Sequence, residues 1–388
     1  MKKSRKINFM KIENILFIAL VTIIAMIARF SLFSIESGDY HRFLKGWYDQ
    51  LVENNGFKAV GMDIGDYMPT YYYILAFLTY LPIKDLVGIK LVSCIADVVL
   101  ALVVFKIVNH ITGSRNKSIV AYATVLFLPS VILNSSAWGQ CDSIFTLFIL
   151  LSFYSILKGK DWHCIVYFSI AFVFKIQAIF FAPVILVLWL RGKVRLRTVL
   201  AFPIVYIVSI LPALFTGGNF LDLITVYFRQ STQYNMLNMY IQNAWGLLFQ
   251  AKSEQMAAAG IFFAGGVVLV ALFLILRSNI ELNDKNILTL SALFTLLVPF
   301  VLPHMHERYY YPATIFALIF IIINPKKIWT FLIMEFCLFQ AEAHNLFGKD
   351  AMDFNFSVLM VTVVLVTYFK VVYDQLGLNI SEEKKKRS

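Results

Sequence analysis

Residues 163–197 read HCIVYFSIAFVFKIQAIFFAPVILVLWLRGKVRLR, a long apolar run that ends in a basic cluster. Its apolar part is long enough to cross a bilayer, and Lys175 is the one formal charge inside it. Basic segments flank the run on both sides, and such segments favour the cytoplasmic side of a membrane. If both flanks lie on the cytoplasmic side, the chain between them must cross the membrane twice. The stretch therefore predicts two short helices that turn near Lys175 on the outer side.

The whole chain shares this apolar character. Of its 388 residues, 60% are apolar and 15% are charged, against roughly half and a quarter in soluble domains. The mean hydropathy is +0.74. One soluble core of this length cannot bury so much apolar surface, so soluble, disordered and collagen-like classes are excluded. The net charge of +11 lies beside apolar segments, which argues against nucleic acid as a partner and favours the lipid bilayer.

The apolar runs predict an all-α polytopic bundle of about twelve transmembrane helices, forming a single integral membrane domain over residues 1–388. The predicted spans are 13–34, 86–109, 119–136, 142–157, 163–174, 176–190, 198–216, 257–277, 287–302, 313–324, 328–341 and 356–372. Residues 70–82 are expected to form an interfacial or re-entrant helix, because another crossing there would place every later basic segment on the outer side.

The basic segments also predict the orientation. With the N-terminus inside, 21 of the 34 Lys and Arg residues fall on the cytoplasmic side, as the positive-inside rule requires. Both termini are then cytoplasmic basic tails, at 1–12 and 373–388. The first outer loop, at 35–85, is long and carries interfacial helices, and a second long outer loop covers 217–256.

Polar residues of the kinds used in catalysis gather in the predicted outer segments. These residues are Asp39, Asp66, Tyr67, Trp138, Gln140, Asp142, Lys175, Gln177, His304, His306, Glu307, Arg308 and Tyr309. Ionisable groups at membrane depth usually mark a site or a pathway. A transporter needs a polar route through both leaflets, whereas a cluster on one side favours chemistry on the outer face.

Several of these residues have structural alternatives. Asp39 could cap a helix, and Asp66 could belong to a turn. Trp138 could anchor the chain at the membrane interface. Lys175 could extend its ammonium group to the outer headgroups.

Further alternatives concern helix ends and charges inside the spans. Gln140 and Asp142 could cap the helix that follows them. Arg29, near the outer end of the first span, could reach the headgroups or bind phosphate. Asp97 lies within the second span and is either paired inside the bundle or functional.

The sequence does not demand a metal ion or a cofactor. His304 and His306 have the spacing of a strand rather than of one helix face. Asp39, Asp66 and these histidines could converge on a divalent cation, but their spacing does not require it. No glycine-rich loop occurs in the context that a soluble nucleotide donor needs. We therefore expect neither a metal nor a cofactor.

At these residues the sequence resembles the polytopic GT-C glycosyltransferases that use polyprenyl-phosphate sugars. It is most similar to bacterial proteins like the mannosyltransferase of GPI-anchor synthesis and the ER glucosyltransferases of N-glycan assembly. The matching motifs are Gly38-Asp39-Tyr40, Asp66-Tyr67-Met68-Pro69, Ala137-Trp138-Gly139-Gln140-Cys141-Asp142, Lys175-Ile176-Gln177-Ala178 and His304-Met305-His306-Glu307-Arg308-Tyr309. The family usually has a proline where this chain has Met68.

The resemblance implies an inverting enzyme that moves a hexose, with mannose or glucose favoured. The donor is a polyprenyl-phosphate sugar, and the acceptor is a glycan, a lipid-linked glycan or a surface polymer. The site would face outward from a bacterial cell membrane. Asp39 takes the role of catalytic base, and Lys175, His304 and Arg308 take that of the donor phosphate site. The residues left for sugar and acceptor contacts or for support are Asp66, Tyr67, Trp138, Gln140, Asp142, Gln177, His306, Glu307 and Tyr309.

Three other functions remain open at this stage. A lipid-linked glycan flippase or exporter needs a polar path through the inner halves of the spans. A polymerase or ligase acting on polyprenyl-diphosphate glycans is expected to have a large arginine-rich outer loop, but 217–256 contains only Arg229. A scaffold without catalysis leaves the one-sided polar cluster unexplained.

Overall fold

The computed structural model describes residues 2–231, 236–248 and 254–376, and these ranges are almost entirely helical. The first half contains α1 (Lys2–Phe30), the π-helical turn η1 (Tyr40–Leu44), α2 (Lys45–Glu53), η2 (Gly56–Ala59), α3 (Pro69–Leu78), α4 (Asp85–Thr112), α5 (Arg115–Phe127), α6 (Pro129–Ile132), η3 (Leu133–Trp138), α7 (Asp142–Leu157), α8 (Asp161–Phe174), η4 (Ile176–Phe181) and α9 (Ala182–Leu190). The second half contains η5 (Leu196–Leu200), α10 (Ala201–Phe215), α11 (Phe220–Ile224), α12 (Val226–Ser231), β1 (Asn238–Met239), η6 (Gly246–Leu248), α13 (Glu254–Arg277), α14 (Asp284–Val301), β2 (Met305–His306), α15 (Tyr311–Ile323), η7 (Pro325–Lys327), α16 (Ile328–Phe347) and α17 (Phe354–Gln375). The all-α prediction is confirmed.

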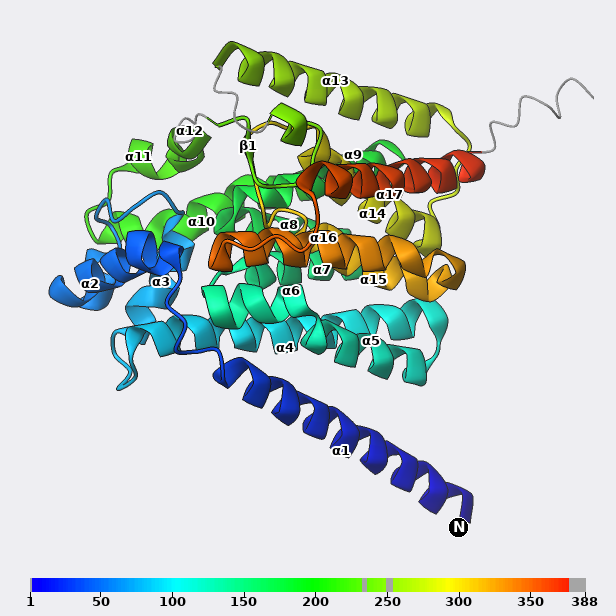
Figure 1. The fold of residues 1–388 in the computed structure, drawn as a ribbon, viewed down its shortest axis with the longest axis horizontal. Coiled ribbons are helices and arrows are strands. Elements are labelled where there is room, and N and C mark those ends of the chain that lie inside the picture. The colour runs from blue at the N-terminus through cyan, green and yellow to red at the C-terminus, as the bar shows by residue number, and fades with distance from the viewer. Residues whose placement is uncertain (1, 232–235, 249–253, 377–388) are drawn as a thin grey trace, which may run out of the picture.

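The long helices form one bundle (Figure 1). In that view α1 and α13 lie at opposite edges, with α4, α7, α15 and α16 between them. Burial agrees, because the most apolar windows of α1 and α13 are only 17% and 28% buried whereas that of α14 is 83% buried. The short helices α2 and α3 gather with α11 and α12 at one end of the bundle, and α1 begins near the other end.

The predicted number of twelve transmembrane helices is not supported. In the described ranges, six helical segments are long and apolar enough to span a membrane, and the pair α5 with α6–η3, bent by 50°, could be a seventh. The segments α7, α8, η4–α9 and α15 are apolar but shorter. Every predicted span coincides with helix, yet apolar composition cannot distinguish a helix buried in the bundle from one that crosses the bilayer.

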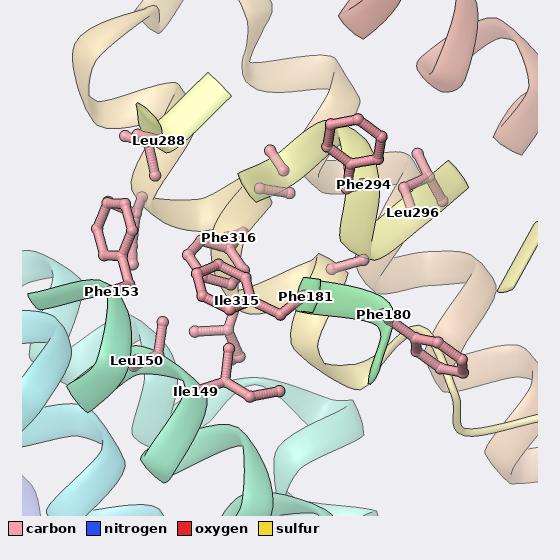
Figure 2. Packing of buried hydrophobic residues seen from close by; sticks show 14 of the residues in the cluster. Ile149, Leu150, Phe153, Phe180, Phe181, Leu288, Phe294, Leu296, Ile315 and Phe316 are labelled. Atoms are coloured by element: carbon pink, nitrogen blue, oxygen red, sulfur yellow. The ribbon is translucent and has the colours of Figure 1, made fainter. Parts of the chain in front are cut away.

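Aromatic packing at the centre of the bundle joins these short helices to α14. Phe316 of α15 stacks on Phe181 of η4, with ring centroids 5.8 Å apart and planes at 4°. Phe153 of α7 packs edge-on against the Phe316 ring, with the ring centroids 5.4 Å apart. Leu288 and Phe294 of α14 belong to the same cluster (Figure 2). The ends of α7 and η4 carry polar residues, and this packing fixes their positions relative to each other.

The predicted break between two helices at Lys175 is confirmed, and its place on the outer side stays a prediction. α8 ends at Phe174, Lys175 is extended with φ −154° and ψ 129°, and η4 begins at Ile176. The helix predicted over 70–82 is also present, as the 10-residue α3. It is too short to cross a bilayer, as expected for an interfacial or re-entrant element.

A buried ion pair ties α1 to the bundle. The Arg29 guanidinium contacts the Asp97 carboxylate at 3.0 Å, and both side chains are 0% exposed. Arg29 also donates to the backbone carbonyls of Ala25 and Leu126. The idea that Arg29 reaches headgroups or phosphate is therefore wrong, and Asp97 is paired inside the bundle.

The predicted loops and tails fit the helices only in part. The first outer loop, 35–85, contains η1, α2, η2 and α3. The expected N-terminal tail is not separate from the first helix, because α1 begins at Lys2. α17 continues into the expected C-terminal tail as far as Gln375, and residues 377–388 lie outside the described ranges. Parts of the loop 217–256 also lie outside them.

Candidate active site

Asp39 is held by two donors, one at the end of η3 and one just after it. Its Oδ2 accepts hydrogen bonds from Trp138 Nε1 at 3.0 Å and from Gln140 Nε2 at 2.6 Å. Gly139 lies between the donors with φ 79°, a left-handed conformation that suits glycine. Asp39 makes no side-chain capping bond to η1. The helix-cap alternative is wrong, because the carboxylate is engaged across the bundle instead.

The chain before Asp39 is fixed by contacts that the sequence did not suggest. Lys90 of α4 is fully buried, and its ammonium group donates to the carbonyls of Leu32, Phe33 and Ile35 at 3.1, 3.2 and 2.5 Å. Ser37 Oγ donates to the Trp138 carbonyl at 2.9 Å. These bonds fix the path from α1 to Asp39.

Two cations, Lys175 and Arg308, share the cavity with Asp39 and form buried ion pairs with other carboxylates. Lys175 Nζ is 2.5 Å from Asp142 Oδ1, and Arg308 Nε is 3.4 Å from Asp142 Oδ2. Arg308 Nη1 donates to Glu307 Oε1 at 2.7 Å. Lys175 is only 5% exposed, so the alternative in which it reaches the headgroups is wrong. Asp142 therefore holds both cations in position through its two carboxylate oxygens.

Trp138 connects the acid to the cations. The Arg308 guanidinium carbon lies 5.2 Å from the centroid of the Trp138 ring, within cation–π range. The same indole donates its N–H to Asp39. At 1% exposed, Trp138 is not an interface anchor. One rigid side chain thus sets the position of both charged groups.

Glu307 stays ionised despite its burial. Burial raises the pKa of this carboxyl, but His306, whose Nδ1 lies 3.6 Å from Glu307 Oε2, and the charge of Arg308 outweigh that effect and lower the pKa to about 2. Between them, Lys175 and Arg308 contact two carboxylates, Asp142 and Glu307. An anion that reaches the two cations shares them with these carboxylates.

One cavity of about 740 Å³ brings the predicted residues together. It is lined by Asp39, Asp66, Tyr67, Gln140, Lys175, Gln177, His304, His306, Glu307, Arg308 and Tyr309. Trp138 and Asp142, each 1% exposed, lie behind its wall. Another part of the wall is apolar and includes Ile179 and Ile261, which are 45% and 52% exposed. The cavity therefore has charged and apolar parts.

Of the two histidines, His306 lies in the strand β2, as the spacing predicted, whereas His304 lies in the bend before it. β2 pairs in parallel with β1, and His306 is opposite Met239. His304 has φ 60°, and its Nδ1 is 2.7 Å from the carbonyl oxygen of Met236. Because a carbonyl can only accept, Nδ1 carries the proton. His304 can therefore present a second N–H to an anion only as an imidazolium.

The ranges that the structure describes contain no group of three or more His, Cys, Asp or Glu side chains placed to hold a metal ion. Asp39, Asp66 and the histidines share the cavity without forming such a group. What the arrangement offers is a carboxylate held by two donors, two buried cations and an apolar wall.

Two further polar residues behind the site were missed from the sequence. Asn134 Nδ2 donates to Asp142 Oδ2 and to Glu342 Oε1, both at 3.0 Å. Glu342 of α16 is fully buried. Asn134 precedes two serines, and Glu342 lies between Gln340 and His344, so neither is distinguished in the sequence from its polar neighbours. Only the folded bundle shows that they meet.

Comparison with known proteins identifies the family of this chain. The family model described as glycosyltransferase family 87 matches residues 67–300, more than half of the chain. A stretch of 145 residues is 26% identical to GPI mannosyltransferase 1 of Candida albicans. That match covers 36% of this chain and 36% of the relative, so the chain spans about a third of the curated relative that it matches. With its apolar helices, the chain is a membrane enzyme that belongs to glycosyltransferase family 87.

Proposed function

We propose that this glycosyltransferase moves a hexose, with inversion, from a polyprenyl-phosphate sugar to an acceptor on the outer face of the membrane. The acceptor is a glycan, a lipid-linked glycan or a surface polymer. Mannose is favoured over glucose, because the curated relative is named a mannosyltransferase. The observation that carries the proposal is the cavity shared by Asp39, Lys175 and Arg308.

Asp39 is the proposed catalytic base. The hydrogen bonds from Trp138 and Gln140 both reach Oδ2, which leaves Oδ1 to meet the acceptor hydroxyl. The two bonds to Oδ2 hold the carboxylate in one orientation. The acceptor O–H gives its proton to Asp39 while its oxygen attacks the anomeric carbon. The bond from that carbon to the phosphate oxygen breaks, and polyprenyl phosphate leaves with the electron pair.

Lys175 and Arg308 are the proposed donor phosphate site. The leaving group gains negative charge as its bond to the sugar breaks, so fixed cations stabilise the transition state more than the ground state. Asp142 and Glu307 offset part of the positive charge before the donor binds. This limits the affinity for the ground state and leaves the stronger interaction for the departing phosphate. His304 contributes when it is protonated.

The other lining residues have supporting roles in this proposal. Asp66, Gln177 and His306 are placed to hydrogen-bond sugar hydroxyls, and Tyr67 and Tyr309 offer aromatic faces. Trp138, Gln140, Asp142 and Glu307 position the charged groups. The apolar wall at Ile179 and Ile261 suits the polyprenyl chain.

The proposed orientation places both termini in the cytoplasm of a bacterial cell. α1 begins and α17 ends at the end of the bundle away from α2 and α3 (Figure 1). The basic residues of the N-terminal segment lie in the first turns of α1, and those of the C-terminal segment follow α17 in the sequence. By the positive-inside rule, the cavity beside α2 then faces outward.

The test is a transfer assay on protein purified in lipid, with synthetic short-chain polyprenyl-phosphate mannose, glucose and N-acetylglucosamine. Membrane extract supplies the acceptor, and the readout is release of polyprenyl phosphate, with EDTA or with magnesium. Asp39→Asn is compared with Asp49→Asn, an exposed first-loop carboxylate that does not line the cavity. We expect Asp39→Asn to reduce transfer about 10²- to 10⁴-fold and Asp49→Asn to leave it unchanged.

Each other outcome has a distinct meaning. Full activity of Asp39→Asn would remove it from the role of base. Activity lost with EDTA would indicate a metal. No release from any donor would reject the proposed donor and favour the flippase, exporter or polymerase alternatives.

A further inference from the structure

A pair of stacked rings on the cavity wall has no part in the reaction described so far. Tyr240, which follows β1, and His344, in the last turn of α16, both line the cavity. Their ring centroids are 3.4 Å apart and their planes differ by 7°. They belong to segments about a hundred residues apart in the chain, so the stack depends on the folded structure.

A carboxylate fixes both rings. Asp350, between α16 and α17, accepts a hydrogen bond from the Tyr240 hydroxyl and another, at 2.9 Å, from His344 Nδ1. Both bonds reach the same oxygen, Oδ1, so neither ring can rotate without losing one. The Tyr240 backbone has φ 66°, which is energetically costly for a residue with a side chain. Such conformations cluster at functional sites.

The surroundings show which surface a ligand would meet. Phe354 lies 4.9 Å from the Tyr240 ring at 48°, and His344 covers another side of that ring. The imidazole of His344 is partly exposed, at 35%, and the exposed Asn345 lies next to it on the cavity wall. Nδ1 is engaged by Asp350, so Nε2 is the His344 atom available to meet a hydroxyl.

We propose that the Tyr240–His344 stack is the acceptor subsite and that it binds a saccharide ring. This inference rests on the proposed function. A sugar ring has an apolar face of C–H groups, which packs on an aromatic ring, and an edge of hydroxyls, which needs polar partners. The stack provides the aromatic ring, and His344 Nε2 and Asn345 provide the polar partners for the hydroxyls. The apolar wall at Ile179 and Ile261 suits a lipid chain instead, so donor and acceptor enter against different walls.

The experiment compares acceptor use with donor use in the full-length protein in lipid. Polyprenyl-phosphate mannose is the donor, and graded amounts of membrane extract supply the acceptor. Half of the extract is first treated with periodate, which destroys vicinal diols and so inactivates saccharide acceptors. Release of polyprenyl phosphate without extract reports the slow reaction of the donor with water.

His344→Ala removes the exposed ring. We expect the half-saturating amount of extract to rise about tenfold, a change of the size that aromatic contacts provide. The KM for the donor and the hydrolysis rate should stay within about twofold. Tyr240→Phe keeps both rings and loses one bond to Asp350, so its rise should be about two- to threefold. Phe347→Leu, on the same turn of α16 but off the cavity wall, serves as the matched control.

The outcomes separate this inference from the proposed function. No release by the wild type from the mannose donor here, or from the glucose and N-acetylglucosamine donors of the transfer assay, rejects the proposed function itself. Release by the wild type with an unchanged half-saturating amount in both variants rejects the acceptor subsite. Full acceptor activity after periodate treatment rejects the saccharide. If His344→Ala also loses hydrolysis, the variant is misfolded and the result for Tyr240→Phe decides.

Discussion

Replacing Trp138 by Phe tests the link between the base and the cations. The substitution keeps an aromatic ring beneath Arg308, so the contact at 5.2 Å is largely preserved. It removes one donor, the indole N–H that lies 3.0 Å from Asp39 Oδ2. Gln140 Nε2 remains at 2.6 Å. The carboxylate then has one fixed donor instead of two.

The size of the effect follows from the kind of bond. A hydrogen bond to a charged group contributes about 1.5–3 kcal/mol, and about 1.36 kcal/mol corresponds to a factor of ten in rate. The bond orients Asp39 rather than reacting, and Gln140 retains part of that orientation. We therefore expect kcat to fall roughly ten- to a hundredfold, with the KM for the donor nearly unchanged.

The assay is release of polyprenyl phosphate under saturating donor and acceptor. Trp162→Phe, at an exposed tryptophan of α8, is the matched control. If Trp138 acts through Asp39, the double variant Trp138→Phe with Asp39→Asn should be no slower than Asp39→Asn alone. A well-folded Trp138→Phe enzyme with kcat within twofold of the wild type would refute the reasoning, as would additive losses in the double variant.

The neighbouring charges give two further predictions. Arg308→Lys keeps the charge but loses the planar fork that contacts Glu307 and Asp142 together; we expect the KM for the donor to rise and kcat to fall, each about tenfold, and unchanged donor kinetics would remove Arg308 from the phosphate site. Glu307→Gln tests stability against pH. The pKa of Glu307 falls from 4.5 to about 2 on folding, so its contribution, roughly 3 kcal/mol, is present above pH 4.5 and is lost as the pH falls towards 2. As the pH falls from 4.5 towards 2, the Tm of the wild type should lose its advantage over the Tm of Glu307→Gln. A difference in Tm that does not change with pH would contradict the lowered pKa of Glu307.

Much of the helical fold could be predicted from the sequence. Each apolar run became a helix, and the basic flanks correctly required a turn at Lys175 inside a continuous apolar stretch. The number of crossings could not be predicted. α7 has 16 residues and α15 has 13, and both are apolar because they lie in the centre of the bundle. A buried helix and a lipid-facing helix present the same composition.

The candidate site was predicted in composition but not in its internal order. Polar residues of the predicted outer segments, such as Asp39, Lys175 and Arg308, do line one cavity. Their pairing could not be foreseen, since it depends on which helices are neighbours. Lys90 shows the limit most clearly. Within a predicted span it looks like an isolated charge, but it is satisfied by three carbonyls that lie more than fifty residues away.

The pair formed by Arg29 and Asp97 has a consequence for biogenesis. The two residues are 68 positions apart, so α1 is synthesised and inserted well before its partner in α4. Until then Arg29, in the last turn of α1, lacks its carboxylate partner, and a long basic side chain near a helix end extends towards the membrane interface instead. Asp39 lies ten residues after Arg29, so we expect the base to take its final position only after α4 has paired with α1.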